Sequence, residues 1–162
     1  MRHTISLLVK NRFGVLAHIA GMFGARAYNI ESLSVGETED PNISRMTIIT
    51  SGDERVIEQV LKQLNKQIDV IKVQDLTGEE FVQRELLLIK VNADSSKRSE
   101  IVEISDLFRA KIIDVSNRYL IIEVTGDRSK VDAIIKLLTP FGIKELARTG
   151  AVGMIRSSKD NE

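Results

Sequence analysis

A glycine stands at the start of a predicted helix, within the run Asn11-Arg12-Phe13-Gly14-Val15-Leu16. The first N–H groups of a helix have no partners inside it, and the helix dipole adds partial positive charge at that end. Because Gly14 has no side chain, a small anion can approach these main-chain donors closely. Asn11 adds an amide that can accept from an ammonium group or donate to a carboxylate. The turn is therefore a candidate site for a free amino acid, which carries both charges.

The elements that position this turn follow the order βαββαβ. Alternating apolar residues predict a strand at 5–9, and further strands are expected at 30–35, 45–50 and 68–73. The imperfect alternation of the second strand indicates a bulge, and Pro41-Asn42 indicates a turn. Two helices are expected, the first bearing Leu16, Ile19, Ala20 and Phe23, and the second, capped by Asp53, bearing Ile57, Val60, Leu61 and Leu64.

The second half of the chain repeats this order. Strands are predicted at 85–91, 112–115, 119–124 and 143–147, and the last helix has a cap at Asp127 and an end at Gly142. The segments around Phe23 and Phe108 match without a gap, as do Ser51-Gly52-Asp53 and Thr125-Gly126-Asp127. Two copies of one unit are therefore predicted.

We expect an α+β fold of two ferredoxin-like βαββαβ units, each a four-stranded antiparallel sheet with two helices on one face. The expected domains are 1–76, a linker at 77–83, and 84–162, which ends in a polar tail beginning at Ser157. Residues 150–155 are expected either to add a strand or to pack on a second copy. Leu8, Leu86, Leu88 and Ile121 point away from the expected cores, which favours dimerisation or packing of the two units over a role at sheet edges.

Composition excludes several functions. Lys plus Arg equals Asp plus Glu at 23 each among 162 residues, so the chain has no general attraction for nucleic acid or membrane. Residues 44–50 also lack the aromatic side chains of an RNA-binding sheet. The chain has no cysteine, and we expect a cytoplasmic protein. His3 and His18 have no partners of the kind that catalysis needs, and both are expected at the surface, so an enzyme with its own active site is not predicted.

The second repeat provides an internal comparison for the glycine turn. The alternative is that Gly14 serves only the tight connection between strand and helix, but the equivalent stretch, Ser95-Ser96-Lys97-Arg98-Ser99-Glu100, has no glycine. Glu100 would also repel a carboxylate. The binding site is therefore predicted in the first unit alone.

Several motifs closely resemble the family of small regulatory subunits of acetolactate synthase (acetohydroxyacid synthase). They are Asn11-Arg12-Phe13-Gly14-Val15-Leu16, Tyr28-Asn29-Ile30-Glu31-Ser32-Leu33, Ser44-Arg45-Met46-Thr47, Ile112-Ile113-Asp114-Val115 and Ala147-Arg148-Thr149-Gly150. The resemblance covers nearly the whole chain, and the first unit looks like an ACT domain, the amino-acid-binding form of this fold.

The resemblance implies a non-catalytic role. The small subunit of this family binds a large subunit that carries thiamine diphosphate, Mg²⁺ and FAD, raises its activity and confers feedback inhibition by valine in branched-chain amino-acid synthesis. This chain itself is expected to bind no cofactor. Gly52-Asp53-Glu54 and Gly126-Asp127-Arg128 resemble the start of a diphosphate-anchoring motif, but both are better explained as helix caps.

The family's valine contacts fall on Asn11, Gly14, Val15 and Leu16 of one copy, and on Asn29 and Ile30 of a neighbouring copy in a homodimer paired through its ACT domains. Asn29 has an alternative role as a turn residue. A different partner is the main alternative for the function: a stand-alone ACT sensor that regulates a transcription factor or a transporter.

Overall fold

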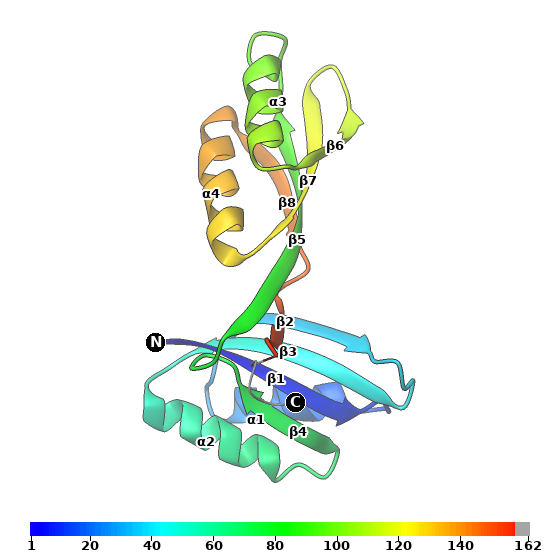
Figure 1. Cartoon of the computed structure of the whole chain (residues 1–162), viewed down its shortest axis with the longest axis vertical. Helices are drawn as coiled ribbons and strands as arrows, with labels where there is room; N and C mark the ends of the chain where they lie inside the picture. The colour runs from blue at the N-terminus through cyan, green and yellow to red at the C-terminus, as the bar shows by residue number, and fades with distance from the viewer. Residues whose placement is uncertain (158–162) are drawn as a thin grey trace. The chain divides into compact units, whose positions relative to one another are not determined.

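The computed structural model describes residues 1–157, which form two compact units. Unit 1 comprises Met1–Val82 together with a segment that returns at Ala151, and unit 2 comprises Gln83–Gly150. Each unit has its own helices, its own antiparallel sheet and its own apolar core, and each is described separately below (Figure 1). The predicted fold of two ferredoxin-like units is confirmed.

Unit 1 forms its sheet in the order β2-β3-β1-β4, with α1 and α2 on one side of it (Figure 1). Ile5, Leu7 and Val9 face the helices and are at most 1% exposed. The alternation of the first strand therefore builds the centre of this core. The elements are β1 (Arg2–Lys10), α1 (Val15–Ala25), β2 (Ile30–Glu37), β3 (Ile43–Ser51), α2 (Glu54–Asn65) and β4 (Val70–Asp75).

Local signals in unit 1 are confirmed, with one correction. The pairing of β2 with β3 shifts register between Ile30 and Ser32, which is the expected bulge. Asp53 caps α2 by accepting from the main-chain N–H of Val56 at 2.9 Å. The predicted buried stripe of α1 is wrong in part, because Leu16 is 45% exposed and Ala20 is exposed as well. The helix begins at Val15, and the residues three to four positions apart from there form the face that packs on the sheet. They are Val15, Ile19, Met22 and Phe23.

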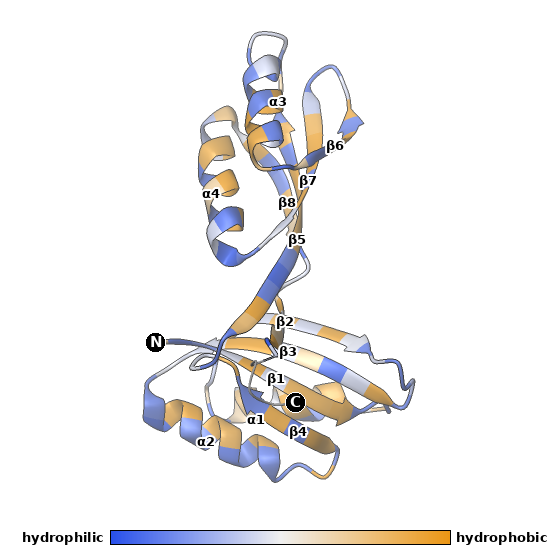
Figure 2. Cartoon of the chain, in the orientation of Figure 1, coloured by the Kyte–Doolittle hydropathy of each residue, from blue (hydrophilic) through white to orange (hydrophobic). Residues whose placement is uncertain are grey.

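Unit 2 repeats the plan with the strand order β6-β7-β5-β8. Asp127 caps α4 by accepting from the N–H of Lys130 at 2.9 Å, and a 3₁₀ turn separates that helix from Gly142. The mixed colours of α2 and α4 in Figure 2 show the two-sided pattern of these helices. The elements are β5 (Phe81–Asn92), α3 (Arg98–Leu107), β6 (Lys111–Val115), β7 (Tyr119–Gly126), α4 (Arg128–Leu138), η1 (Thr139–Phe141) and β8 (Ile143–Arg148).

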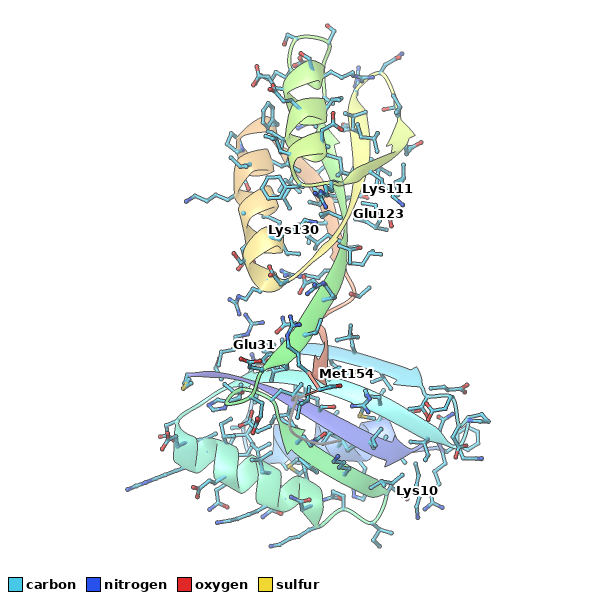
Figure 3. All side chains as sticks on the ribbon, in the orientation of Figure 1. Lys10, Glu31, Lys111, Glu123, Lys130 and Met154 are labelled. Atoms are coloured by element: carbon cyan, nitrogen blue, oxygen red, sulfur yellow. The ribbon has the colours of Figure 1, made fainter. Side chains whose placement is uncertain are left out.

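The last strand, β9 (Val152–Ile155), belongs to unit 1 and pairs with β5, whose first two residues, Phe81 and Val82, are also part of unit 1. The sequence instead places this segment in a second domain running over 84–162. The main-chain N–H of Ala151 donates to Ser32 Oγ at 3.1 Å, and that of Gly153 donates to Thr47 Oγ1 at 3.3 Å. These hydrogen bonds hold β9 on the helix-free face of unit 1, where Figure 3 labels Met154. The expected polar tail lies, after Ser157, outside the described residues.

The helix-free face of unit 1 consequently differs from the apolar, uncovered surface that the sequence predicts. Hydroxyl side chains line much of this face, and Thr4, Ser6 and Thr47 are buried there. A Cβ on Gly153 would lie 2.9 Å from Leu76 Cδ1, so β9 packs closely against unit 1 and a side chain at this position would have to displace the end of Leu76. In unit 2, by contrast, Leu88 on the helix-free face remains 37% exposed.

Candidate functional site

The candidate site is the turn that joins β1 to α1. Gly14 stands at the N-cap of α1 with φ 80° and ψ −10°, which is the left-handed conformation. No side chain caps this end of the helix. A Cβ built on Gly14 would meet no atom within 4 Å, so the position needs glycine for its backbone angle and has open space around it.

The main-chain donors of this turn are only partly used. His18 N–H donates to Gly14 O at 2.8 Å, and Val15 N–H makes a long contact of 3.5 Å with Arg12 O. Among residues 1–157, the N–H groups of Gly14 and Leu16 donate no hydrogen bond. Both residues are exposed, whereas Val15 is buried. The turn thus presents two unpaired donors at the positive end of a helix.

Asn11 is held in place by its neighbours. Its Nδ2 donates to Glu37 Oε1 at 3.0 Å and to Pro41 O at 2.8 Å, and its main-chain N–H donates to Asn42 O at 2.7 Å. The amide hydrogens are therefore engaged, which leaves Oδ1 as an acceptor. Glu37 brings a carboxylate to the turn. Sequence reasoning missed Glu37, and its place at the end of an edge strand, opposite the first turn, is visible only once the strands are paired.

An ion pair fixes the other side of the turn. Arg12 Nε donates to Asp69 Oδ1 at 2.9 Å, and Lys10 N–H donates to Asp69 O at 2.9 Å. The turn is therefore tied to the connection between α2 and β4, and the Arg12 guanidinium is already engaged by a carboxylate.

Asn29 and Ile30 lie at the opposite end of the same sheet. Ile30 pairs with Thr50, which pairs with His3 near the start of β1, whereas the turn follows Lys10 at the end of that strand. Seven residues of extended strand separate the two ends, or about 23 Å. Figure 3 labels Glu31 and Lys10 at these opposite ends. Within one chain, the structure brings Asn11, Gly14, Val15 and Leu16 together and leaves Asn29 and Ile30 apart from them.

The equivalent turn of unit 2 is built differently. Its N-cap residue, Lys97, has φ −112°, so this turn needs no left-handed residue. The Asp94 carboxylate accepts from the N–H groups of Ser96 and Lys97 at 3.0 and 3.2 Å, and from the Ser96 hydroxyl at 2.6 Å. These hydrogen bonds lower the pKa of Asp94. In unit 2 a carboxylate of the chain itself thus occupies two main-chain donors just before the helix, and among the described residues no carboxylate does so at the turn of unit 1.

The prediction that His3 lies at the surface is wrong, while His18 is exposed as expected. His3 is 6% exposed, because the alternation of β1 places it on the same face as Ile5 and Leu7. Its Nδ1 lies 3.2 Å from Asp75 Oδ2. Burial raises the pKa of Asp75, but hydrogen bonds from Thr77 and the contact with His3 outweigh it, so that pKa lies below its ordinary value. The pair joins the start of β1 to the end of β4.

Neither a metal-binding cluster nor a helix that could span a membrane is found among the described residues. Residues 1–157 contain no group of three or more His, Cys, Asp or Glu side chains arranged to hold a metal ion. In that same part of the chain, no helix has both the length and the apolar character needed to cross a membrane.

Comparison with known proteins gives consistent matches over both units. The family described as AHAS small subunit-like ACT domain matches residues 5–72, and the family described as small subunit of acetolactate synthase matches residues 84–157. A probable acetolactate synthase small subunit of Archaeoglobus fulgidus is 58% identical over 159 residues, which cover 98% of this chain and 99% of the relative. The acetolactate synthase small subunit of Aquifex aeolicus is 54% identical, with coverage of 99% and 84%.

A solved structure of the same family also matches this chain over almost its whole length. The crystal structure of the acetolactate synthase small subunit from Thermotoga maritima has a TM-score of 0.88 and 45% sequence identity with this chain. The match covers 98% of this chain and 99% of that one, so it includes both units.

Proposed function

This chain belongs to the family of acetolactate synthase small subunits, and we propose that it binds the catalytic large subunit, raises its activity and makes it sensitive to inhibition by valine. In this proposal the chain supplies no catalytic group. Thiamine diphosphate, Mg²⁺ and FAD belong to the large subunit, and both proteins work in the cytoplasm.

One observation carries the sensor role. The N–H groups of Gly14 and Leu16 donate no hydrogen bond within the described residues, at a helix end that no side chain caps. In unit 2 the carboxylate of Asp94 accepts from the N–H groups of Ser96 and Lys97, which lead into the equivalent helix. The contrast supports a role for a ligand carboxylate in unit 1, because it supplies the acceptor that the chain itself supplies in unit 2.

The surroundings of the turn suit the other parts of valine. Asn11 Oδ1 remains available to accept from the ligand's ammonium group, and the carboxylate of Glu37 lies beside Asn11 to balance the positive charge. The half-exposed side chain of Leu16 offers an apolar surface to the isopropyl group. A zwitterion with a short aliphatic side chain therefore fits the chemistry of this turn.

A second copy accounts for Asn29 and Ile30. β2 is an edge strand, since only β3 pairs with it in the sheet of unit 1. If two copies pair their β2 strands antiparallel, the start of β2 in one copy lies beside the end of β2 in the other. Ile30 of the neighbouring copy then comes close to Glu37, and so to the turn at Asn11. We therefore place valine between two copies that pair through their ACT domains.

Regulation then follows from differential affinity. Valine favours one arrangement of the paired ACT domains, and the large subunit is most active with another. Coupling of this kind is typically about 1–3 kcal/mol, or roughly 5–150-fold in affinity.

The test is reconstitution. The chain is mixed with a thiamine-diphosphate-dependent large subunit from the same cell, and acetolactate is assayed with and without valine. We expect co-purification, higher activity than that of the large subunit alone, and inhibition by valine. Binding of valine without recruitment of the large subunit would instead favour a stand-alone sensor with another partner. Failure of both would contradict the proposal.

A further inference from the structure

We propose that the end of unit 1 beside the Gly14 turn is the surface on which the large subunit docks, and that the large subunit meets it with an apolar pocket bordered by carboxylates. This inference rests on the proposed function, which supplies the partner. Three exposed apolar side chains define the surface, which we call the terminal patch: Phe13, Ile68 and Ile71. All three belong to unit 1, and the proposed valine site makes no use of them.

The side chains of the terminal patch are open to solvent. Phe13 is fully exposed, Ile68 is 87% exposed and Ile71 is 52% exposed. β4 pairs with β1 through Val70 and Lys72 but not through Ile71, which is the extra residue of a bulge. Large apolar side chains gathered at an exposed end of a domain are typical of a protein interface, where an aromatic anchor contributes much of the affinity.

Contacts between the turn and the connection from α2 to β4 bring these residues to one place. Arg12 Nε donates to Asp69 Oδ1 at 2.9 Å, and Lys10 N–H donates to Asp69 O at 2.9 Å. Phe13 directly follows Arg12 and Ile68 directly precedes Asp69, so the two apolar residues flank one ion pair. Because both segments are anchored, a partner that binds here has little main-chain freedom to remove.

Lysine side chains border the terminal patch. Lys10, Lys66 and Lys72 are exposed, and among residues 1–157 none of them forms an ion pair with a carboxylate. Lys66 stands two residues before Ile68, and Lys72 directly follows Ile71. Uncompensated positive charge around an apolar centre complements a partner surface that carries carboxylates around an apolar pocket.

The position of the patch in the sheet favours a different protein over a second copy. The copies are proposed to pair through β2, and β4 is the opposite edge of the same sheet. Three strand spacings, or about 14 Å, separate these edges. The exposed acidic residues Glu37, Glu39 and Asp40 lie at the end of β2 and just after it, so they are on the side of the second copy.

The experiment measures binding of the full chain to the large subunit on a biosensor surface. Phe13→Ala and Ile68→Glu should each weaken the complex roughly thirtyfold or more, because one removes the aromatic anchor and the other places a negative charge against the partner's carboxylates. Leu107→Glu makes the matched change in unit 2, at a side chain that is 76% exposed, and should alter the affinity by no more than about twofold. Lys72→Glu should slow association at low salt, and about 0.5 M NaCl should remove most of this difference.

Two further measurements show that the variants remain intact. Their urea midpoints should match that of the natural chain, because the replaced side chains are exposed. Ile68→Glu should bind valine with unchanged affinity by calorimetry, so a weaker complex cannot be attributed to the sensor.

The outcomes separate this inference from the proposed function. If the natural chain binds the large subunit and Phe13→Ala and Ile68→Glu bind it equally well, the terminal patch is overturned and the proposed function stands. Equal losses in Ile68→Glu and Leu107→Glu would also overturn the patch, because added charge alone would explain them. Dissociation of the homodimer in the patch variants, measured by sedimentation, would assign the surface to the second copy instead. If the natural chain itself does not bind the large subunit, the proposed function and the patch both fail.

Discussion

The most direct test of the turn compares Gly14→Asp with Gly14→Asn. Both replacements have nearly the same shape, and Asn and Asp are the side chains that best tolerate the left-handed conformation of Gly14. The space around a Cβ at this position is open, so neither side chain must displace a neighbour. The pair therefore differs in one negative charge beside the main-chain donors.

The structure sets the magnitudes. A φ of 80° costs a residue with a Cβ about 1 kcal/mol of folding free energy, and both variants bear this cost. A carboxylate about 5 Å from the ligand carboxylate adds a repulsion of about 1–3 kcal/mol, for effective dielectric constants between roughly 20 and 80. The dissociation constant of valine should thus be about 5- to 150-fold higher for Gly14→Asp than for Gly14→Asn.

Calorimetry measures the two dissociation constants, and urea unfolding measures the free energies of unfolding. A negative charge at the N-terminus of α1 complements the helix dipole, so Gly14→Asp should be at least as stable as Gly14→Asn. Activation of the large subunit should survive in both variants. Equal valine affinities in the two variants would refute the claim that a ligand carboxylate docks on these donors.

Three further predictions concern other parts of unit 1. Asn11→Ala removes a side chain that makes two hydrogen bonds at the turn, and the dissociation constant of valine should rise about tenfold by calorimetry; unchanged affinity would remove this residue from the site. Because the pKa of Asp75 lies below its ordinary value of 3.8, its stabilising effect is present above that pH and is lost as the pH falls through the lowered pKa. Urea midpoints measured from pH 5 to pH 2 should therefore fall more steeply for the natural chain than for Asp75→Asn. Gly153→Val places a side chain against Leu76 and should speed amide exchange in β9, whereas Met154→Ala, at a residue that is 61% exposed, should not.

The local elements of this chain follow from short-range physics. Alternation in β1, the caps at Asp53 and Asp127 and the bulge after Ile30 all depend on residues a few positions apart. The same is true of the repeat, because each half carries its own complete pattern. The sequence also indicates the glycine turn, since an anion site at a helix end needs only adjacent main-chain groups.

Long-range pairing decided what the sequence could not. Glu37 reaches Asn11 only because β2 and β1 flank β3 in the sheet. His3 is buried because α1 and α2 cover the face of the sheet that it shares with Ile5. From the sequence alone, a buried histidine at the start of a strand cannot be told from an exposed one.

The sequence by itself determined two βαββαβ units and a donor-rich turn in the first of them, because secondary structure, caps and helix ends are fixed by near neighbours. Only the tertiary structure decided that β9 returns to unit 1 and that Glu37 reaches the turn at Asn11. The hydrogen bond between Ala151 and Ser32 spans 119 residues, and no local pattern in the sequence encodes such a contact.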